Sequence, residues 1–374
     1  MTRPMRETYL DWNATTPLRP AAAAAMQATM ARCGNPSSVH RWGREARLAV
    51  EAAREAVAAL AGMPAAGVVF TSGGTEANHL ALLGNGRERV LVSAVEHNSV
   101  LQAVPGSERI PVDSNGLVDL AGLDALLAAE TRPGLVSVML ANNETGIIQP
   151  IAEIAALAHA SGALVHCDMI QAAGKLPVAA AALGADLVSL SAHKIGGPPG
   201  IGAVIAGDGV ELAPLLRGGG QERGRRAGSE NLIGIAGFAA AAEAALADLA
   251  AYDRVRALRD RLESEILAAA PDSIVIGAAA PRLPNTAAIA MPGVPAETQV
   301  IALDLAGIMV TAGAACSSGK VGPSHVLAAM GLPPVITNSA IRVSLGWTTS
   351  EADIDQFVAA WTALHRRLQQ RRAA

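Results

Sequence analysis

The sequence predicts an α/β protein with a mostly parallel central sheet, helices on both faces of that sheet, and a smaller C-terminal α/β domain. Three observations support this prediction. Apolar strand patterns alternate with helical patterns between residues 68 and 206, and such alternation is typical of parallel sheets covered by helices. Reactive side chains follow several of these strands. Beyond Pro271 the pattern changes, which indicates a second domain.

Length and composition fit a two-domain enzyme. Of the 374 residues, 51% are hydrophobic and 17% are charged, so the chain can bury a large core and is not disordered. Aromatic residues make up only 2%, which leaves alanine to fill much of the interior. The net charge of −4 argues against a general nucleic-acid binder. The three cysteines do not make a disulfide framework in a chain this long.

We expect a cytoplasmic protein without a membrane segment. The first residues lack the apolar stretch of a signal peptide. The alanine-rich run 239–251 is interrupted by Glu243 and Asp248, which favours a packed helix over a membrane span.

The N-terminal part begins with an irregular or short-strand segment through Pro20. Two helices are predicted after it, at residues 21–30 and 44–61, and Gly62 is a suitable C-cap for the second. A short apolar strand at 68–70 then turns into a helix through Gly-Gly-Thr. Strand and helix patterns continue to alternate along the ranges 89–94, 134–141, 151–160, 163–168, 186–191 and 202–206.

The C-terminal part reads differently. Glycine and arginine enrich residues 217–231, which predicts a loop. Long helices are expected over 233–269, strands at 285–291, 309–311 and 340–345, and a last helix at 351–371. The predicted organisation is an N-terminal segment 1–20 packing with the small domain, a large domain 21–270 and a small domain 271–374.

Five residue types able to carry chemistry fall just after predicted strands. Active groups of open α/β sheets gather beyond the carboxyl ends of the strands, so these residues are expected at one edge. They are Thr75, His97, Asn143, Asp168 and Lys194.

Lys194 and Asp168 are the two groups that pyridoxal phosphate (PLP) needs most. A lysine that ends an apolar strand can form a Schiff base, and an aspartate at the end of a neighbouring strand can hold a protonated pyridine nitrogen. Taken alone, Lys194 is more simply a solvated loop residue, and Asp168 could equally be a turn residue. The surrounding Ser, His and Gly-Gly-Pro-Pro favour the functional interpretation of Lys194.

Several neighbours could complete a PLP site. Gly74 and Thr75 open a helix, where free N–H groups and the helix dipole favour a phosphate, although most Gly-Gly turns only change direction. Ser191 and His193 flank the Lys194 turn and could add donors. Gln171 could hydrogen-bond the phenolic oxygen of the cofactor.

Two further residues have competing interpretations. His97 could stack on the pyridine ring and move protons, although a lone histidine is more often structural. Asn143 lies in a stretch, residues 142–146, that is also typical of an Asx-rich turn.

Cys316 differs from the other cysteines. The residues after it are small and polar, which predicts an exposed thiol on a loop, and Lys320 could favour its thiolate. Cys167 lies within a predicted buried strand and is expected in the core, whereas Cys33 has no reactive context. Arg342 lies in an alternating strand and could bind a carboxylate with two parallel hydrogen bonds, the alternative being an ordinary ion pair.

Together these motifs resemble the cysteine desulfurases, fold-type I PLP enzymes of the aminotransferase class V group. The resemblance runs almost from end to end. Matching segments are residues 10–17, 34–40, 71–78, 96–97, 142–146, 168–175, 191–202, 218–229, 313–319 and 341–346.

The resemblance implies a role for each candidate residue. Lys194 would carry PLP, Asp168 would pair with its ring nitrogen, and His97 would cover the ring. Gln171 would bind the phenolic oxygen, and Asn143 would serve cofactor and substrate. Arg342 would orient the substrate carboxylate, and Cys316 would accept the sulfur. The phosphate would be held by Gly74, Thr75, Ser191 and His193, with Ser229 from the partner subunit of a homodimer.

The implied reaction removes sulfur from L-cysteine, giving L-alanine and a persulfide on Cys316 for transfer to an acceptor such as an iron–sulfur scaffold protein. The loop length is similar to that of the group serving iron–sulfur cluster or nitrogenase assembly. No resident metal is implied, although Cys316 could transiently ligate an iron–sulfur cluster. Ser229 replaces a usual threonine and Gln221 a usual histidine, and neither change removes a catalytic group. A selenocysteine lyase, a class V transaminase and a non-catalytic scaffold are the alternatives.

Overall fold

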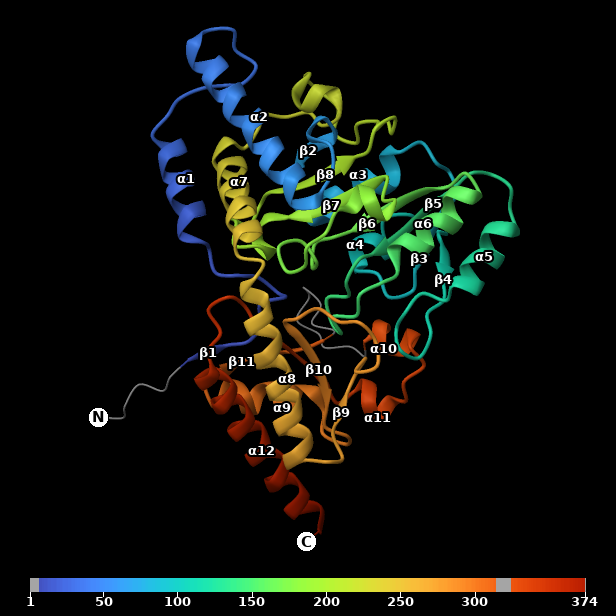
Figure 1. Cartoon of the computed structure of the whole chain (residues 1–374), viewed down its shortest axis with the longest axis vertical. Coiled ribbons are helices and arrows are strands. Elements are labelled where there is room, and N and C mark those ends of the chain that lie inside the picture. The colour runs from blue at the N-terminus through green and yellow to red at the C-terminus, as the bar shows by residue number, and fades with distance from the viewer. Residues whose placement is uncertain (1–6, 314–323, 374) are drawn as a thin grey trace.

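A seven-stranded sheet forms the centre of the larger part of the molecule (Figure 1). The computed structural model describes residues 7–313 and 324–373. Neighbouring strands of this sheet follow the order β2 (Val68–Thr71), β8 (Gly202–Ala206), β7 (Leu187–Ser191), β6 (Leu164–Asp168), β5 (Leu135–Met139), β3 (Val90–Ser93) and β4 (Glu108–Ile110). All pairs from β7 to β4 are parallel, and β8 runs antiparallel to both neighbours. The predicted mostly parallel sheet is confirmed.

Helices cover both faces of this sheet, because alternate strand residues point into two separate cores. Val68 and Phe70 belong to one core, whereas Val69 between them belongs to the other. The first core is closed by α1 (Pro20–Met30), α2 (Arg41–Ala61), α5 (Leu120–Ala128), α6 (Ile151–Ala160) and α7 (Leu232–Ala247). The second is closed by α3 (Gly74–Gly84) and α4 (Asn98–Leu101).

Helix α2 begins and ends where its capping residues allow. His40 Nδ1 accepts a hydrogen bond from Gly43 N at 3.3 Å, so the helix starts earlier than the predicted residue 44. Gly62 ends it in the left-handed conformation with φ of 62°, as predicted from the sequence.

A second sheet forms the smaller part, with the order β12 (Thr311–Ala312), β13 (Ala340–Ser344), β10 (Thr286–Ala290) and β9 (Ile274–Val275), all antiparallel. Its core is completed by α9 (Ala296–Asp304) and α12 (Glu351–Ala373), whose Phe357 and Trp361 are fully buried. Short helices α10 (His325–Ala329) and α11 (Pro334–Thr337) pack nearby. Single turns of 3-10 helix lie at Ala65–Gly67, Ala180–Leu183, Ala192–Lys194 and Gln221–Gly224.

The first described residues pack with this smaller part. Strand β1 (Thr8–Tyr9) pairs in parallel with β11 (Ile308–Met309), and Leu10 is buried in the same core. Figure 1 shows the chain passing from β1 up to α1, between the two sheets.

The long helix α8 (Ala251–Ala269) packs differently from the prediction. Val255, Leu262 and Ile266 belong to the core of the smaller part, whereas the predicted boundary near Pro271 assigns this helix to the large domain. Figure 1 shows α8 beside α12, away from the large sheet. Its amphipathic pattern predicts a buried face but does not identify the core that receives it.

The helices offer little that could enter a membrane. Within residues 7–313 and 324–373, no helix alone has the length and apolar character to cross one, and α7 with α8 would do so only as a pair bent by 73°. In α7, Phe238 and Ala241 pack instead in the first core.

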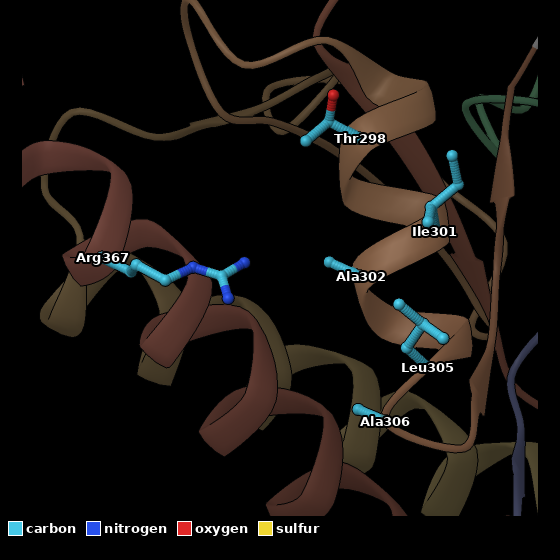
Figure 2. A pocket seen from close by; sticks show the side chains of 6 residues that line it. All are labelled: Thr298, Ile301, Ala302, Leu305, Ala306 and Arg367. Carbon is cyan, nitrogen blue, oxygen red and sulfur yellow. The ribbon is translucent and has the colours of Figure 1, made fainter. Parts of the chain in front are cut away.

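An apolar groove lies between α9 and α12 (Figure 2). Figure 2 shows Arg367 of α12 reaching toward α9, whose Ile301 and Leu305 are 61% and 75% exposed. The lining residues are Thr298, Ile301, Ala302, Leu305, Ala306 and Arg367.

Candidate active site

The carboxyl ends of the parallel strands bring the candidate residues to one edge of the large sheet. Asp168 ends β6, and Lys194 follows β7 by one turn of 3-10 helix. His97 follows β3, and Asn143 follows β5. Thr75 lies in the first turn of α3, directly after β2. The register of β3, β5, β6 and β7 is parallel throughout, so the edge predicted from the sequence exists.

Lys194 is held at this edge by two main-chain oxygens. Its Nζ donates to Asn13 O and to Ala14 O, both at 2.7 Å. Burial, with a smaller effect from Arg342, lowers the pKa of the amine to about 8, although Asp11 and Asp168 raise it. An amine with a lowered pKa has a larger neutral fraction, which is the form that attacks a carbonyl.

Asp168 is a buried carboxylate supported by two hydrogen bonds. Asn78 Nδ2 donates to Oδ2 at 2.8 Å, and Ile170 N donates to Oδ1 at 2.9 Å. Burial raises the pKa of Asp168, whereas these two bonds and the charges of His97 and Lys194 lower it. A further cation beside this carboxylate would favour its charged form.

Asn78 connects Asp168 to His97. Besides its bond to Asp168, Nδ2 donates to Ser99 Oγ at 2.9 Å, and Ser99 Oγ lies 2.8 Å from His97 Nδ1. Because Ser99 N also donates to this Nδ1, at 3.1 Å, Nδ1 is an acceptor and the ring proton lies on Nε2. Burial lowers the pKa of His97, which favours this neutral ring.

The start of α3 forms a cradle beside Ser191. A Cβ added to Gly74 would lie 2.4 Å from Ile170 Cδ1 and 3.4 Å from Ser191 Cβ, so a larger residue would require the Ile170 side chain to move. Among the described residues, no side chain caps this helix end, which leaves its first N–H groups available to an anion. Thr75 is exposed beside it.

His193 lies in the turn after Ser191. Its Nδ1 is 3.2 Å from Thr15 Oγ1. Burial, with a smaller effect from Lys194, lowers the pKa of His193 to about 4. The ring is therefore neutral near pH 7 and can donate one hydrogen bond.

Arg342 and Asn143 come together, but through the main chain of Asn143. Arg342 Nη1 donates to Asn143 O at 2.9 Å, and Nη2 donates to Asp11 Oδ1 at 2.6 Å. Arg342 is only 5% exposed, which argues against an ordinary surface ion pair. Its Nε is buried and has no partner among the described residues.

Ser229 lies on the predicted glycine- and arginine-rich loop, where it is exposed. The loop is anchored by Glu222, whose carboxylate accepts two 2.7 Å hydrogen bonds from Arg54 in the protein interior. Glu222 and Arg223 adopt left-handed φ values of 49° and 58°, which non-glycine residues rarely adopt. Packing thus holds a strained loop in one shape.

Cys316 lies outside the described residues. On either side of it, Gly313 and Ser324 both approach Glu144: Ser324 Oγ donates to Glu144 Oε2 at 2.6 Å, and a Cβ on Gly313 would lie 2.9 Å from the same oxygen. Cys167 is buried in β6, as expected, and Cys33 is exposed.

Sequence reasoning assigned no role to Asn13 and Asn78, although both lie at the site. Asn13 O accepts from Lys194 Nζ and from Gln171 Nε2, the latter at 2.9 Å. Asn78 is fully buried beside Ala77 and Leu80. A polar residue on the buried face of a helix was the available signal for Asn78. No local pattern marks Asn13, because its partners are distant in the sequence.

Comparison with known proteins places this arrangement in a family. Residues 8–357 match the family model described as aminotransferase class V. A cysteine desulfurase of Cereibacter sphaeroides is 45% identical over 369 residues, covering 95% of this chain and 94% of that protein. A cysteine desulfurase of Klebsiella pneumoniae is 43% identical over 376 residues, covering 97% and 94%. Among solved structures, a NifS-like protein of Rickettsia africae ESF-5 is similar with a TM-score of 0.89 and 35% identity, covering 96% of this chain and all of that one.

Proposed function

The chain belongs to the cysteine desulfurases of the aminotransferase class V family, and we propose that it uses Lys194 to hold PLP and Cys316 to take the sulfur of L-cysteine. The products are L-alanine and a persulfide on Cys316. The observation that carries this proposal is the half-buried Lys194 amine, of lowered pKa, at the same sheet edge as the buried carboxylate of Asp168.

The residues at the site fit PLP. The start of α3, uncapped by any described side chain, and the glycine cradle beside Ser191 suit its phosphate. Asp168 is a buried carboxylate already surrounded by donors, so it suits a protonated ring nitrogen. The side-chain amide of Gln171 lies close to the amine of Lys194, because both donate to Asn13 O.

When bound, PLP supplies an electron sink that stabilises negative charge at the Cα of an attached amino acid. Asp168 keeps that sink cationic. The Lys194 amine would act as a general base at Cα of the substrate, and neutral His97, with its proton on Nε2, would move a proton. Arg342, with its unpartnered Nε, and Asn143 orient the substrate carboxylate.

Sulfur transfer requires a nucleophile, and we assign this role to Cys316. The thiolate attacks the sulfur of the substrate, so that an S–S bond forms as the C–S bond breaks. The electron pair of the broken bond stays on the carbon, which takes a proton and leaves as L-alanine. The persulfide then passes its outer sulfur to an acceptor protein. We propose an iron–sulfur scaffold as that acceptor, since relatives include a cysteine desulfurase IscS of Dictyoglomus turgidum at 39% identity.

We also propose a homodimer in the cytoplasm. Several large apolar side chains on α1, on α2 and between them are exposed, and we propose that a second copy of the chain covers them. They are Met30 at 61%, Val39 at 85%, Trp42 at 55% and Leu48 at 70%. A second copy covering them would bring another exposed residue, Ser229, within reach of a neighbouring site. The cytoplasmic location rests on the sequence alone.

The test is product analysis with L-cysteine and a thiol reductant. The PLP-loaded protein should form sulfide and L-alanine in equal amounts. Cys316→Ser should still bind PLP and cysteine but release no sulfide, and Lys194→Ala should lose the visible absorbance of bound PLP and both products. Normal sulfide release by Cys316→Ser would show that Cys316 does not accept the sulfur. Visible absorbance retained by Lys194→Ala would show that Lys194 does not hold PLP.

A further inference from the structure

Lys175 is a buried lysine next to the site. It follows β6 by a short turn, and its fractional exposure is 3%. Its Nζ donates to Gln171 Oε1 at 2.8 Å and to Asn13 Oδ1 at 3.2 Å. Both acceptors are neutral amide oxygens, and Lys175 forms no ion pair with any described residue. Burying an amine without a carboxylate opposes folding, so its retention needs an explanation.

The choice of lysine at this position is informative in this chain. Of the 29 lysine and arginine residues, only three are lysines, at positions 175, 194 and 320. Arginine therefore supplies nearly every cation, but it is wide and permanently charged, whereas lysine is a compact donor that can lose its proton. Burial lowers the pKa of Lys175 well below its ordinary value, and the charges of Lys194 and Arg342 lower it further.

The contact between Lys175 and Gln171 fixes the orientation of an amide. The Lys175 amine donates, so the oxygen of the Gln171 amide faces it, and the Gln171 Nε2 faces the opposite side. On that side Nε2 donates to Asn13 O at 2.9 Å, the same oxygen that accepts from Lys194. Without Lys175, only the bond to Asn13 O would oppose a half rotation of the amide, which would present the oxygen of Gln171 beside Lys194 instead.

We propose that Lys175 is a positioning residue that holds the Gln171 amide with its N–H toward the cofactor. The inference rests on the proposed function, in which Gln171 donates to the phenolic oxygen of PLP. A donor at that oxygen stabilises its negative charge and so lowers the pKa of the nitrogen that Lys194 contributes to the bound cofactor. Three other charged groups that act on Lys194, namely Arg342, Asp11 and Asp168, are unchanged by substitution of Lys175. The mutual repulsion between Lys175 and Lys194 is lost in any uncharged variant, so a variant that is uncharged but still donates, such as Lys175→Gln, separates the hydrogen bond from the charge.

The experiment is a pH titration of the visible absorbance of the PLP-loaded protein. Lys175→Met has a side chain of similar length but no donor. Its titration midpoint should lie about 1 to 2 pH units above that of the unsubstituted protein, the effect of one hydrogen bond to a charged group. Lys175→Gln, which restores an N–H donor, should return the midpoint part of the way.

A double-mutant cycle shows whether Lys175 acts through Gln171. Gln171→Leu should raise the midpoint by a similar amount, and adding Lys175→Met to it should cause no further change. Fully additive shifts would overturn the proposal, because Lys175 would then act independently of Gln171. An unchanged midpoint in Lys175→Met would overturn it as well.

The stability of the PLP-free protein, measured by urea unfolding, shows whether Lys175 positions Gln171 or has a purely structural role. Lys175→Met removes a buried amine that has no carboxylate partner among the described residues but leaves Gln171 Oε1 without its donor. These two effects oppose each other, so the urea unfolding midpoint should change little. A lowered unfolding midpoint together with an unchanged titration would make Lys175 a structural residue and overturn the proposal. If the unsubstituted protein gained no visible absorbance with PLP, the proposed function itself would fail. A normal titration that Lys175→Met does not shift would overturn this inference alone.

Discussion

Arg342 Nη2 donates a 2.6 Å hydrogen bond to Asp11 Oδ1, so a guanidinium on β13 is held by a residue 331 positions away. Its Nη1 donates to Asn143 O at 2.9 Å, and its Nε is buried without a partner among the described residues. The guanidinium thus links three segments of the chain at the site, and among the described residues nothing accepts from its Nε.

Removing this guanidinium should weaken cysteine binding. Arg342→Ala is expected to raise the KM for L-cysteine by about 10- to 100-fold, which corresponds to about 1.5–3 kcal/mol for a charge-assisted contact. Steady-state sulfide release over a range of cysteine concentrations measures it. Arg342→Lys keeps the charge but loses the planar fork, so it should recover only part of the affinity. An unaltered KM in Arg342→Ala would show that Arg342 does not bind the substrate.

The lowered pKa of Lys194 should appear in the rate of PLP binding. A pKa of about 8 leaves roughly a tenth of the amines neutral at pH 7, against fewer than about one in a thousand for an ordinary lysine. Because the neutral amine attacks the aldehyde, the rate should rise with pH and level off above about pH 8. Stopped-flow absorbance between pH 6 and 10 measures this rate.

Asp11→Asn is the matched variant for this prediction. Asp11 raises the pKa of Lys194, so removing its charge should move the rise in rate to lower pH. A rate that keeps climbing to pH 10 in the unsubstituted protein would mean that the Lys194 amine is not perturbed.

Asn78 should contribute to both stability and activity. Asn78→Ala leaves Asp168 Oδ2 and Ser99 Oγ without a buried donor, which should lower the free energy of unfolding by about 2–3 kcal/mol and reduce turnover. Urea denaturation measures the first effect. Asn85→Ala is the control: Asn85 bonds main-chain oxygens at the other end of the same helix, away from the site. Its turnover should be normal, and equal turnover in both variants would contradict a role for Asn78.

His166 should make the protein sensitive to acid. Its ring is buried between Ser137 Oγ and Ser189 Oγ, and burial lowers its pKa to about 3 from an ordinary value of 6.5. Between these values the unfolded chain binds the proton and the folded protein does not, so stability falls as pH drops below 6.5. The loss from this residue at pH 5 is on the order of 2 kcal/mol.

His166→Gln isolates this effect. Glutamine can bond both hydroxyls but does not titrate, so its free energy of unfolding should change less between pH 7 and pH 5 than that of the unsubstituted protein. Urea denaturation at the two pH values gives the difference. Identical changes in both proteins would mean that His166 takes up its proton while folded.

The exposed apolar face around α2 should hold the homodimer together. Trp42→Glu places a charge there and should shift the mass measured by light scattering from dimer to monomer. It should also weaken PLP binding, since Ser229 would lose its place beside the partner's phosphate site. Leu305→Glu, in the groove between α9 and α12 (Figure 2), adds the same charge at an exposed leucine and should leave the dimer intact. A dimer that survives Trp42→Glu would exclude this face as the interface.

The large sheet, and the edge of it that carries the candidate residues, could be predicted because both depend on local sequence patterns. Apolar runs such as Leu187–Ser191 have the length and composition of buried strands, and the residue after such a run has little freedom in where it lies. Lys194 and Asp168 therefore reached one edge as expected. Strand β4 has only three residues, of which one is buried, so its pattern was too weak to predict.

The rest could not be predicted, because it depends on contacts between distant segments. The sequence of α8 indicates a buried face but not which of two cores receives it. The contacts of Asn13 reach Gln171, Lys175, Lys194 and Asn285, and no periodicity near residue 13 encodes them. The link from Asp168 through Asn78 to Ser99 likewise joins a strand end to two helices, each with its own pattern.

Lys194 and Gln171 both donate to the peptide oxygen of Asn13, an atom that every amino acid carries. Replacing the Asn13 side chain leaves that acceptor in place, so alanine scanning cannot probe it, and relatives with another residue there would keep it too. Its contribution becomes measurable only by editing the backbone, for example with an ester in place of the amide between positions 13 and 14, which weakens the oxygen as an acceptor. Part of this site is thus set by the path of the main chain and not by the identity of its side chains.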